Sequence, residues 1–233
     1  MYRNGYGVEK DYQQAVTWYR KAAEQDHALG QNNLGYMYLN GLGVEKDYQQ
    51  AVTWYRKLAE QDHAFGQNNL GVMYQNGYGV EKDYKQAVIW YRKAAEQGNV
   101  YGQNNLGYMY HNGYGIEQDY QQAVAWYRKA AEQGDALGQN NLGVMYEKGY
   151  GVEKDYQQAV TWYRKAAEQG HVLGYNNLGV MYEKGCGVEQ DYEAALNWYD
   201  NAGNKQALQR LESERGIKLE EWSLGSRRRI RKI

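Results

Sequence analysis

A block of 36 residues recurs along almost the whole chain. The 21 residues Gly5–Gln25 return unchanged as Gly149–Gln169. A unit of this length buries its apolar face only by stacking on its neighbours, so the chain is expected to form a solenoid. The usual product of a solenoid is a long binding surface, which favours a scaffold over an enzyme. The same tryptophan marks six copies, at Trp18, Trp54, Trp90, Trp126, Trp162 and Trp198.

Each repeat reads as two helices joined by a glycine-containing loop. In the copy at residues 27–62 the first helix is predicted over Ala28–Asn40, and Gly41 supplies the left-handed residue that closes a helix. Asp47 opens the second helix, with Gln50 in a capping-box position. Apolar residues in that helix recur at i, i+3, i+4 and i+7, which indicates an amphipathic helix. The sequence therefore predicts an all-α fold, a right-handed α-solenoid of stacked antiparallel helix pairs with a 36-residue repeat.

This repeat resembles a known family. Residues 28–59 follow the pattern Ala-x5-Leu-Gly-x2-Tyr-x2-Gly-x-Gly-Val-x2-Asp-Tyr-x2-Ala-x2-Trp-Tyr-x2-Ala-Ala, with Leu58 in place of one alanine. The pattern is similar to the Sel-one-like repeat (SLR), a relative of the tetratricopeptide repeat, and it extends over about residues 1–203. Gly30 departs from it, because alanine is common there. The resemblance implies a non-enzymatic adaptor, frequently bacterial, that holds a protein or peptide and needs no cofactor.

The array is expected to be incomplete at its N-terminal end. Residues 1–25 supply only a loop and a second helix, so the stripe of Tyr12, Ala15, Tyr19 and Ala22 is predicted to be partly bare. The expected covers are the missing first helix of a longer parent, the C-terminal end of another molecule, or a symmetric copy of the same edge. The predicted cap at the C-terminal end disfavours head-to-tail stacking, so a homodimer through the N-terminal edge is the favoured prediction for this chain.

The C-terminal end, residues 204–233, is expected to hold a capping helix and a basic tail. Asn204–Arg215 has one apolar face and one polar face, as a terminal cap needs. Ser223–Ile233 reads as a loose tail that carries five of the 27 basic residues, and the rest of the chain has 22 basic against 28 acidic residues. Binding to nucleic acid or to an anionic membrane is therefore expected only through the tail.

If tetratricopeptide geometry holds, the first helices line a concave groove. One column in that groove is uniform: it consists of Asn32, Asn68, Asn104, Asn140 and Asn176. An asparagine column can pair with the N–H and C=O groups of an extended peptide. The alternative is that duplication copied these asparagines and that they are solvated or bond to the neighbouring helix.

Other groove columns vary between otherwise similar copies, which makes them candidates for partner contact. The N-terminal half is predicted to be apolar and aromatic, and the C-terminal half charged; drift at tolerant surface positions is the alternative. The predicted contact residues in these columns are Tyr36, Phe65, Tyr101, Tyr108, His111, Glu147, Lys148, Glu183 and Lys184.

Catalysis and metal binding find little support. No Ser-His-Asp order, metal-ligand motif or phosphate loop appears, and His27, His63 and His171 lie one repeat or more apart, too far for one zinc ion. The single cysteine, Cys186, stands where other copies have tyrosine and is expected to be a half-exposed loop thiol. No apolar run is long enough for a transmembrane helix, and no signal peptide is evident, so the cytoplasm is favoured.

Three functional hypotheses follow. The first is a protein-interaction scaffold that binds a partner in the groove. The second is an immunity or inhibitor protein that wraps a toxin domain, as some SLR proteins do. The third, a β-lactam or peptidoglycan hydrolase, is attached to SLR relatives with a cysteine pair in each repeat, and the single cysteine here counts against it. Self-assembly of the solenoid into filaments is a structural alternative.

Overall fold

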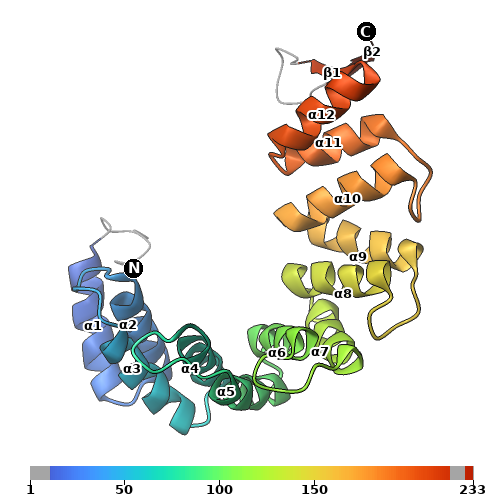
Figure 1. Ribbon diagram of the computed structural model, residues 1–233. Helices are drawn as coiled ribbons and strands as arrows, with labels where there is room; N and C mark the ends of the chain where they lie inside the picture. Colours follow the sequence, from blue (N-terminus) through green and yellow to red (C-terminus); the bar gives the residue numbers. More distant parts are fainter. Residues whose placement is uncertain (1–10, 221–228, 233) are drawn as a thin grey trace. The chain divides into compact units, whose positions relative to one another are not determined.

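The computed structural model describes residues 11–220 and 229–232 of the chain, and the predicted loop at residues 1–10 and the basic residues Arg227 and Arg228 lie outside these ranges (Figure 1). The described residues form twelve helices and two short strands. The helices are α1 (Tyr12–Glu24), α2 (Ala28–Asn40), α3 (Tyr48–Glu60), α4 (Ala64–Asn76), α5 (Tyr84–Glu96), α6 (Val100–Asn112), α7 (Tyr120–Glu132), α8 (Ala136–Lys148), α9 (Tyr156–Glu168), α10 (Val172–Lys184), α11 (Tyr192–Asn201) and α12 (Lys205–Arg215).

The all-α repeat predicted from the sequence is confirmed. The first helices of the repeats are α2, α4, α6, α8 and α10, and the second helices are α1, α3, α5, α7, α9 and α11. The helices begin and end at the predicted residues. Gly41 ends α2 with φ of 67°. At the start of α3, the Asp47 carboxylate accepts a hydrogen bond from the Gln50 backbone N–H at 3.0 Å. The chain divides into two compact units, residues 1–119 and residues 120–233, which are unit 1 and unit 2 below.

The core lies both within the helix pairs and between neighbouring repeats. Ala51 and Tyr55 of α3 pack with Leu70 and Met73 of α4, and all four are buried. Trp90, from the following second helix, packs against the same cluster. Burying a large apolar side chain contributes about 1.5–3 kcal/mol, so packing on the neighbouring repeat stabilises each repeat in addition to packing within its own pair.

Glycines inside the first helices allow the helices to approach closely. A Cβ on Gly71 of α4 would lie 2.7 Å from the ring of Tyr91 in α5. A Cβ on Gly30 of α2 would lie 2.7 Å from the Cβ of Ala22 in α1. The departure from alanine at position 30 therefore reflects a tight contact between two helices.

A second glycine column joins each loop to the preceding repeat. Gly79 has φ of 65°, and a Cβ there would lie 2.4 Å from the backbone oxygen of Tyr48. One residue earlier, Tyr78 stacks on the Tyr48 ring with centroids 4.7 Å apart. Loop and helix therefore meet through a backbone contact and a ring contact at once.

The two ends differ from expectation. Ala15 of the supposedly bare N-terminal stripe is buried in a core with Leu34 and Met37 of α2, and Tyr12 and Tyr19 are half-buried against that core. The prediction of a partly bare stripe is wrong for Ala15, because α1 packs on the first helix that follows it, whereas Tyr12, Tyr19 and Ala22 remain half-exposed. Trp18 of α1 is more exposed than any of them. A homodimer through this edge stays a prediction.

At the C-terminal end, α12 packs on α11, and Leu211 is buried with Leu196 and Tyr199. Strand β1 (Ile217–Glu220) pairs antiparallel with β2 (Arg229–Lys232), with Ile217 opposite Lys232. The expectation of a loose tail is therefore wrong for residues 229–232, since main-chain pairing orders this segment.

Replacing Gly79 with alanine should destabilise the fold more than replacing Gly98. Gly98 also has positive φ, at 82°, but its added Cβ would meet nothing within 4 Å, and the equivalent residue one repeat earlier, Asp62, adopts φ of 62°. Gly98→Ala should cost about 1–2 kcal/mol from backbone strain, whereas Gly79→Ala adds about 1–3 kcal/mol of overpacking. Urea unfolding of both variants measures the difference, and equal losses would refute the contact argument.

Candidate functional site

The asparagine column forms a ladder of hydrogen bonds between successive first helices. The Asn32 side-chain oxygen accepts from Asn69 Nδ2 at 2.9 Å, and the Asn68 oxygen accepts from Asn105 Nδ2 at 2.9 Å. In unit 2, the Asn140 oxygen accepts from the next helix in the same way.

The ladder extends to the last helix. The Asn176 oxygen accepts from Asn204 Nδ2 at 2.8 Å, and Asn204 is the residue that caps α12. Asn68, Asn104 and Asn140 are buried. Of the two interpretations of this column, bonding to the neighbouring helix is the interaction present in the structure, and contact with a partner stays a prediction.

Exposed apolar side chains gather on the first helices of unit 1. Leu29, Phe65 and Tyr101 stand at the same repeat position and are 72%, 57% and 55% exposed. Each lies three residues before a ladder asparagine and so on the same side of its helix. Because the ladder joins α2 to α4 and α4 to α6, the three side chains belong to one surface. We call this surface, with exposed Tyr36 and Tyr108, the first-helix face of unit 1.

This face carries no formal charge. None of the residues of α2, α4 and α6 is Asp, Glu, Lys or Arg, although a quarter of the chain is charged. Burial lowers the pKa of His111, the titratable imidazole of α6, so it is neutral at pH 7. The first helices of unit 1, which were predicted to be apolar and aromatic, therefore present an uncharged surface that carries aromatic rings.

The first helices of unit 2 carry both apolar and charged groups. Leu137 and Leu173 are exposed at the position of Leu29. Lys148 is also exposed and forms an ion pair with the neighbouring Glu147. Lys184, one repeat later, is exposed as well.

Glu147 and Glu183, at the same repeat position in unit 2, each accept a hydrogen bond from a tyrosine of the following second helix. The Tyr163 hydroxyl donates to Glu147 Oε2 at 2.7 Å, and the Tyr199 hydroxyl donates to Glu183 Oε2 at 2.6 Å. Burial and the neighbouring carboxylate raise the pKa of both tyrosines, so both remain protonated donors. This variable position of the first helices is therefore hydrogen-bonded to a tyrosine of the core.

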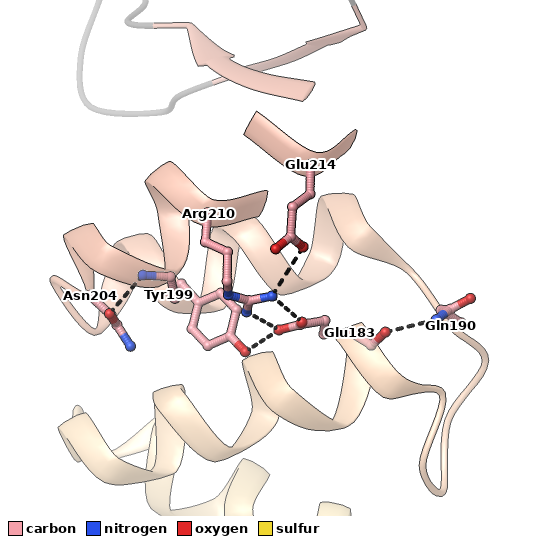
Figure 2. A network of polar contacts seen from close by, with 7 residues as sticks. Glu183, Gln190, Tyr199, Asn204, Arg210 and Glu214 are labelled. Atoms are coloured by element: carbon pink, nitrogen blue, oxygen red, sulfur yellow. Dashed lines mark hydrogen bonds and ion pairs between the residues drawn. The ribbon is translucent and has the colours of Figure 1, made fainter. Parts of the chain in front are cut away.

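Glu183 also holds the last helix in place, as Figure 2 shows. Arg210 of α12 donates from Nη1 to Glu183 Oε1 at 2.7 Å and from Nη2 to Oε2 at 2.8 Å. Glu214 lies on the other side of the guanidinium, at 3.4 Å. Arg210 first, then the Tyr199 hydroxyl, hold the pKa of the Glu183 carboxyl below its usual value. The sequence predicted that Glu183 lines a groove, but it did not indicate Arg210, because no repeat-position signal marks a residue of the cap.

The repeats themselves decide the family. The Sel1 repeat matches the chain six times, at residues 1–27, 28–63, 64–99, 100–135, 136–171 and 172–206. The chain belongs to the Sel1 repeat family. Sel1 repeat proteins are generally protein-interaction scaffolds and are typically non-catalytic.

Solved bacterial structures resemble the Sel1 repeats of this chain. A protective antigen of uropathogenic Escherichia coli strains, which displays an SLR fold, is 42% identical with a TM-score of 0.79. The match covers 91% of this chain but 47% of that one, so the chain spans about half of the antigen's length. A Sel1 repeat protein from Oxalobacter formigenes is 38% identical over 91% of this chain and 84% of its own, with a TM-score of 0.78.

An immunity protein from Pseudomonas aeruginosa is 25% identical, with a TM-score of 0.59, and the match covers 87% of this chain and 80% of that one. Among curated proteins, none matches at a significant level.

The remaining candidate features are a metal site, the single cysteine and a membrane-spanning helix. In residues 11–220 and 229–232, no three His, Cys, Asp or Glu side chains gather closely enough to hold a metal ion. Cys186 is a free, half-buried thiol packed beside the core that contains Tyr163. No helix in the described part of the chain is long and apolar enough to cross a membrane.

Replacing Asn68 with alanine should reduce stability through the ladder. The change removes the acceptor for Asn105 Nδ2, and a half-buried donor left without a partner costs about 1–3 kcal/mol. Asn76→Ala is the control, because exposed Asn76 donates only to the Val72 backbone oxygen of its own helix. Its cost should stay within about 0.5 kcal/mol. Equal losses of unfolding free energy in urea would contradict the ladder's role.

Docking of α12 should weaken in acid. Because the pKa of Glu183 is lower in the folded state than its ordinary 4.5, the contact stabilises the fold above that value. The stabilisation is lost as the pH falls through the lowered folded pKa. The melting temperature should therefore drop further between about pH 5 and pH 3 in the native chain than in Glu183→Gln. Glu189→Gln, on an exposed loop, serves as the control and should keep the native pH profile.

Proposed function

We propose that this chain is a protein-interaction scaffold and that the first-helix face of unit 1 binds its protein partner. The observation that carries the proposal is the combination of Leu29, Phe65 and Tyr101 on three adjacent helices that have no charged residue. Contiguous exposed apolar groups are uncommon on monomeric proteins and mark interaction sites. Aromatic side chains supply the largest contributions in such interfaces.

The chemistry of the first-helix face of unit 1 indicates which side chains the partner presents to it. An uncharged surface offers no compensation for a charge that loses its water, so the partner is expected to present apolar or aromatic side chains there. The asparagine ladder contributes by fixing the spacing of the helices and thus of Leu29, Phe65 and Tyr101. Tyr36 and Tyr108 add phenol rings with hydroxyl groups suited to a polar rim.

A second candidate is an immunity protein that wraps a toxin domain. It is favoured by the resemblance to the Pseudomonas aeruginosa immunity protein, which extends over 87% of this chain. This function would use the same face, with a toxin domain as the partner. A stable one-to-one complex with the product of a neighbouring gene would support it, and a partner encoded elsewhere would favour a general adaptor.

Site-specific photo-cross-linking tests the binding face. A photoreactive residue at Phe65 should cross-link a protein from cells of the source organism. The same residue at Ile89 of α5, which is exposed to a similar degree but lies on a second helix, should not. In the purified complex, Phe65→Ser combined with Tyr101→Ser should weaken binding about tenfold or more, since each removes an aromatic contact.

The helical circular dichroism of the double variant should match that of the native chain, because both side chains are exposed. Equal cross-linking from Phe65 and Ile89, or unchanged affinity in the double variant, would contradict the proposal.

A further inference from the structure

Glu147 and Glu183 occupy the same position in successive repeats and have the same support. In both, a tyrosine hydroxyl donates to Oε2, from Tyr163 at 2.7 Å and from Tyr199 at 2.6 Å. A carboxylate has about four lone-pair sites, so this bond leaves Oε1 and a second site on Oε2 for other donors. The tyrosine fixes the carboxylate and leaves it able to bind a cation.

The cation differs between the two positions. At Glu183, the Arg210 guanidinium donates to both carboxylate oxygens, at 2.7 and 2.8 Å. At Glu147, the neighbouring Lys148 reaches Oε1 alone. Lys184 is the counterpart of Lys148, and within residues 11–220 it forms no ion pair with Glu183. At Glu183, Arg210 therefore makes the carboxylate contact that the neighbouring lysine makes at Glu147.

Lys148 is a weak occupant of this site. The Lys148 and Arg210 side chains are exposed to a similar extent, 50% and 42%, and so are Glu147 and Glu183, at 18% and 15%, so the two cations differ in geometry rather than in exposure. The lysine ammonium contacts one carboxylate oxygen, and water and salt compete for this single contact. A guanidinium fork matches a carboxylate through two parallel hydrogen bonds, which a lysine cannot make.

We propose that the Glu147–Tyr163 pair of unit 2 binds an arginine side chain of the protein partner, whose guanidinium displaces Lys148. This inference rests on the proposed scaffold function and names the charge that the partner brings to unit 2. The Arg210–Glu183 contact, one repeat later in the same molecule, is its template.

An uncharged residue at the same repeat position in unit 1 provides a comparison for Glu147. Gln75 stands at the same position in unit 1 and accepts a hydrogen bond from the Tyr91 hydroxyl at 2.6 Å. A glutamine therefore fits this position and keeps the tyrosine bond without a carboxylate. Glu147→Gln should leave the fold intact and remove the arginine site, and Gln75→Glu should create one in unit 1.

Titration with N-acetyl-arginine amide tests the site directly. Nuclear magnetic resonance of the full chain should show a saturable shift at the Glu147 carboxylate and at the Tyr163 ring. N-acetyl-lysine amide should produce a weaker response, and Glu147→Gln should lose the shift at Tyr163. Gln75→Glu should gain a response at Tyr91. Glu183 should not respond in either case, because Arg210 already occupies it.

No saturable shift at Glu147, an equal response to lysine, or a Tyr163 response that persists in Glu147→Gln would each overturn the proposal. These readouts lie in unit 2 and use a small probe, whereas cross-linking from Phe65 reports on unit 1 and a whole partner. Failure of the titration with intact Phe65 cross-linking would therefore remove the arginine site alone.

Discussion

The close approach of neighbouring helices is the constraint on which the rest of the structure depends. Where Gly71 faces the Tyr91 ring, any side chain would collide with that ring, and where Gly79 meets the Tyr48 backbone there is no room for a Cβ. These contacts set the distance between successive helices. At that distance short asparagine side chains can reach across, so Asn105 bonds to Asn68. The spacing of the exposed residues follows from the same contact.

The fold was largely predictable because local signals repeat in it. Gly41 predicted the observed end of α2, and Asp47 with the apolar spacing that follows it predicted the start and the amphipathic character of α3. The ends were less predictable. Ala15 is buried because α1 packs on the helix that follows it, and that partner cannot be seen from one repeat alone. Pairing of β1 with β2 depends on a contact between segments about ten residues apart, which a basic composition does not reveal.

The candidate site was predictable as a set of positions but not as a set of partners. A uniform asparagine column suggests a shared role, yet the sequence does not tell whether Asn68 faces a ligand or the next helix. The variable column holds Gln75 and Glu147, and both prove to be acceptors for a buried tyrosine. Arg210 lies outside the repeat pattern, so only the three-dimensional contact identifies it as the residue that holds Glu183.

The cap contact has a consequence for how the number of repeats can change. Helix α12 meets the array through Asn176 and Glu183, and Asn140 and Glu147 are the same residues 36 positions earlier. Recombination between neighbouring copies that removed residues 151–186 would present Asn204 and Arg210 with Asn140 and Glu147 instead. The shorter gene product would end in a correctly capped array. Such a design lets a lineage vary the length of its binding surface in whole repeats while the same terminal helix closes it.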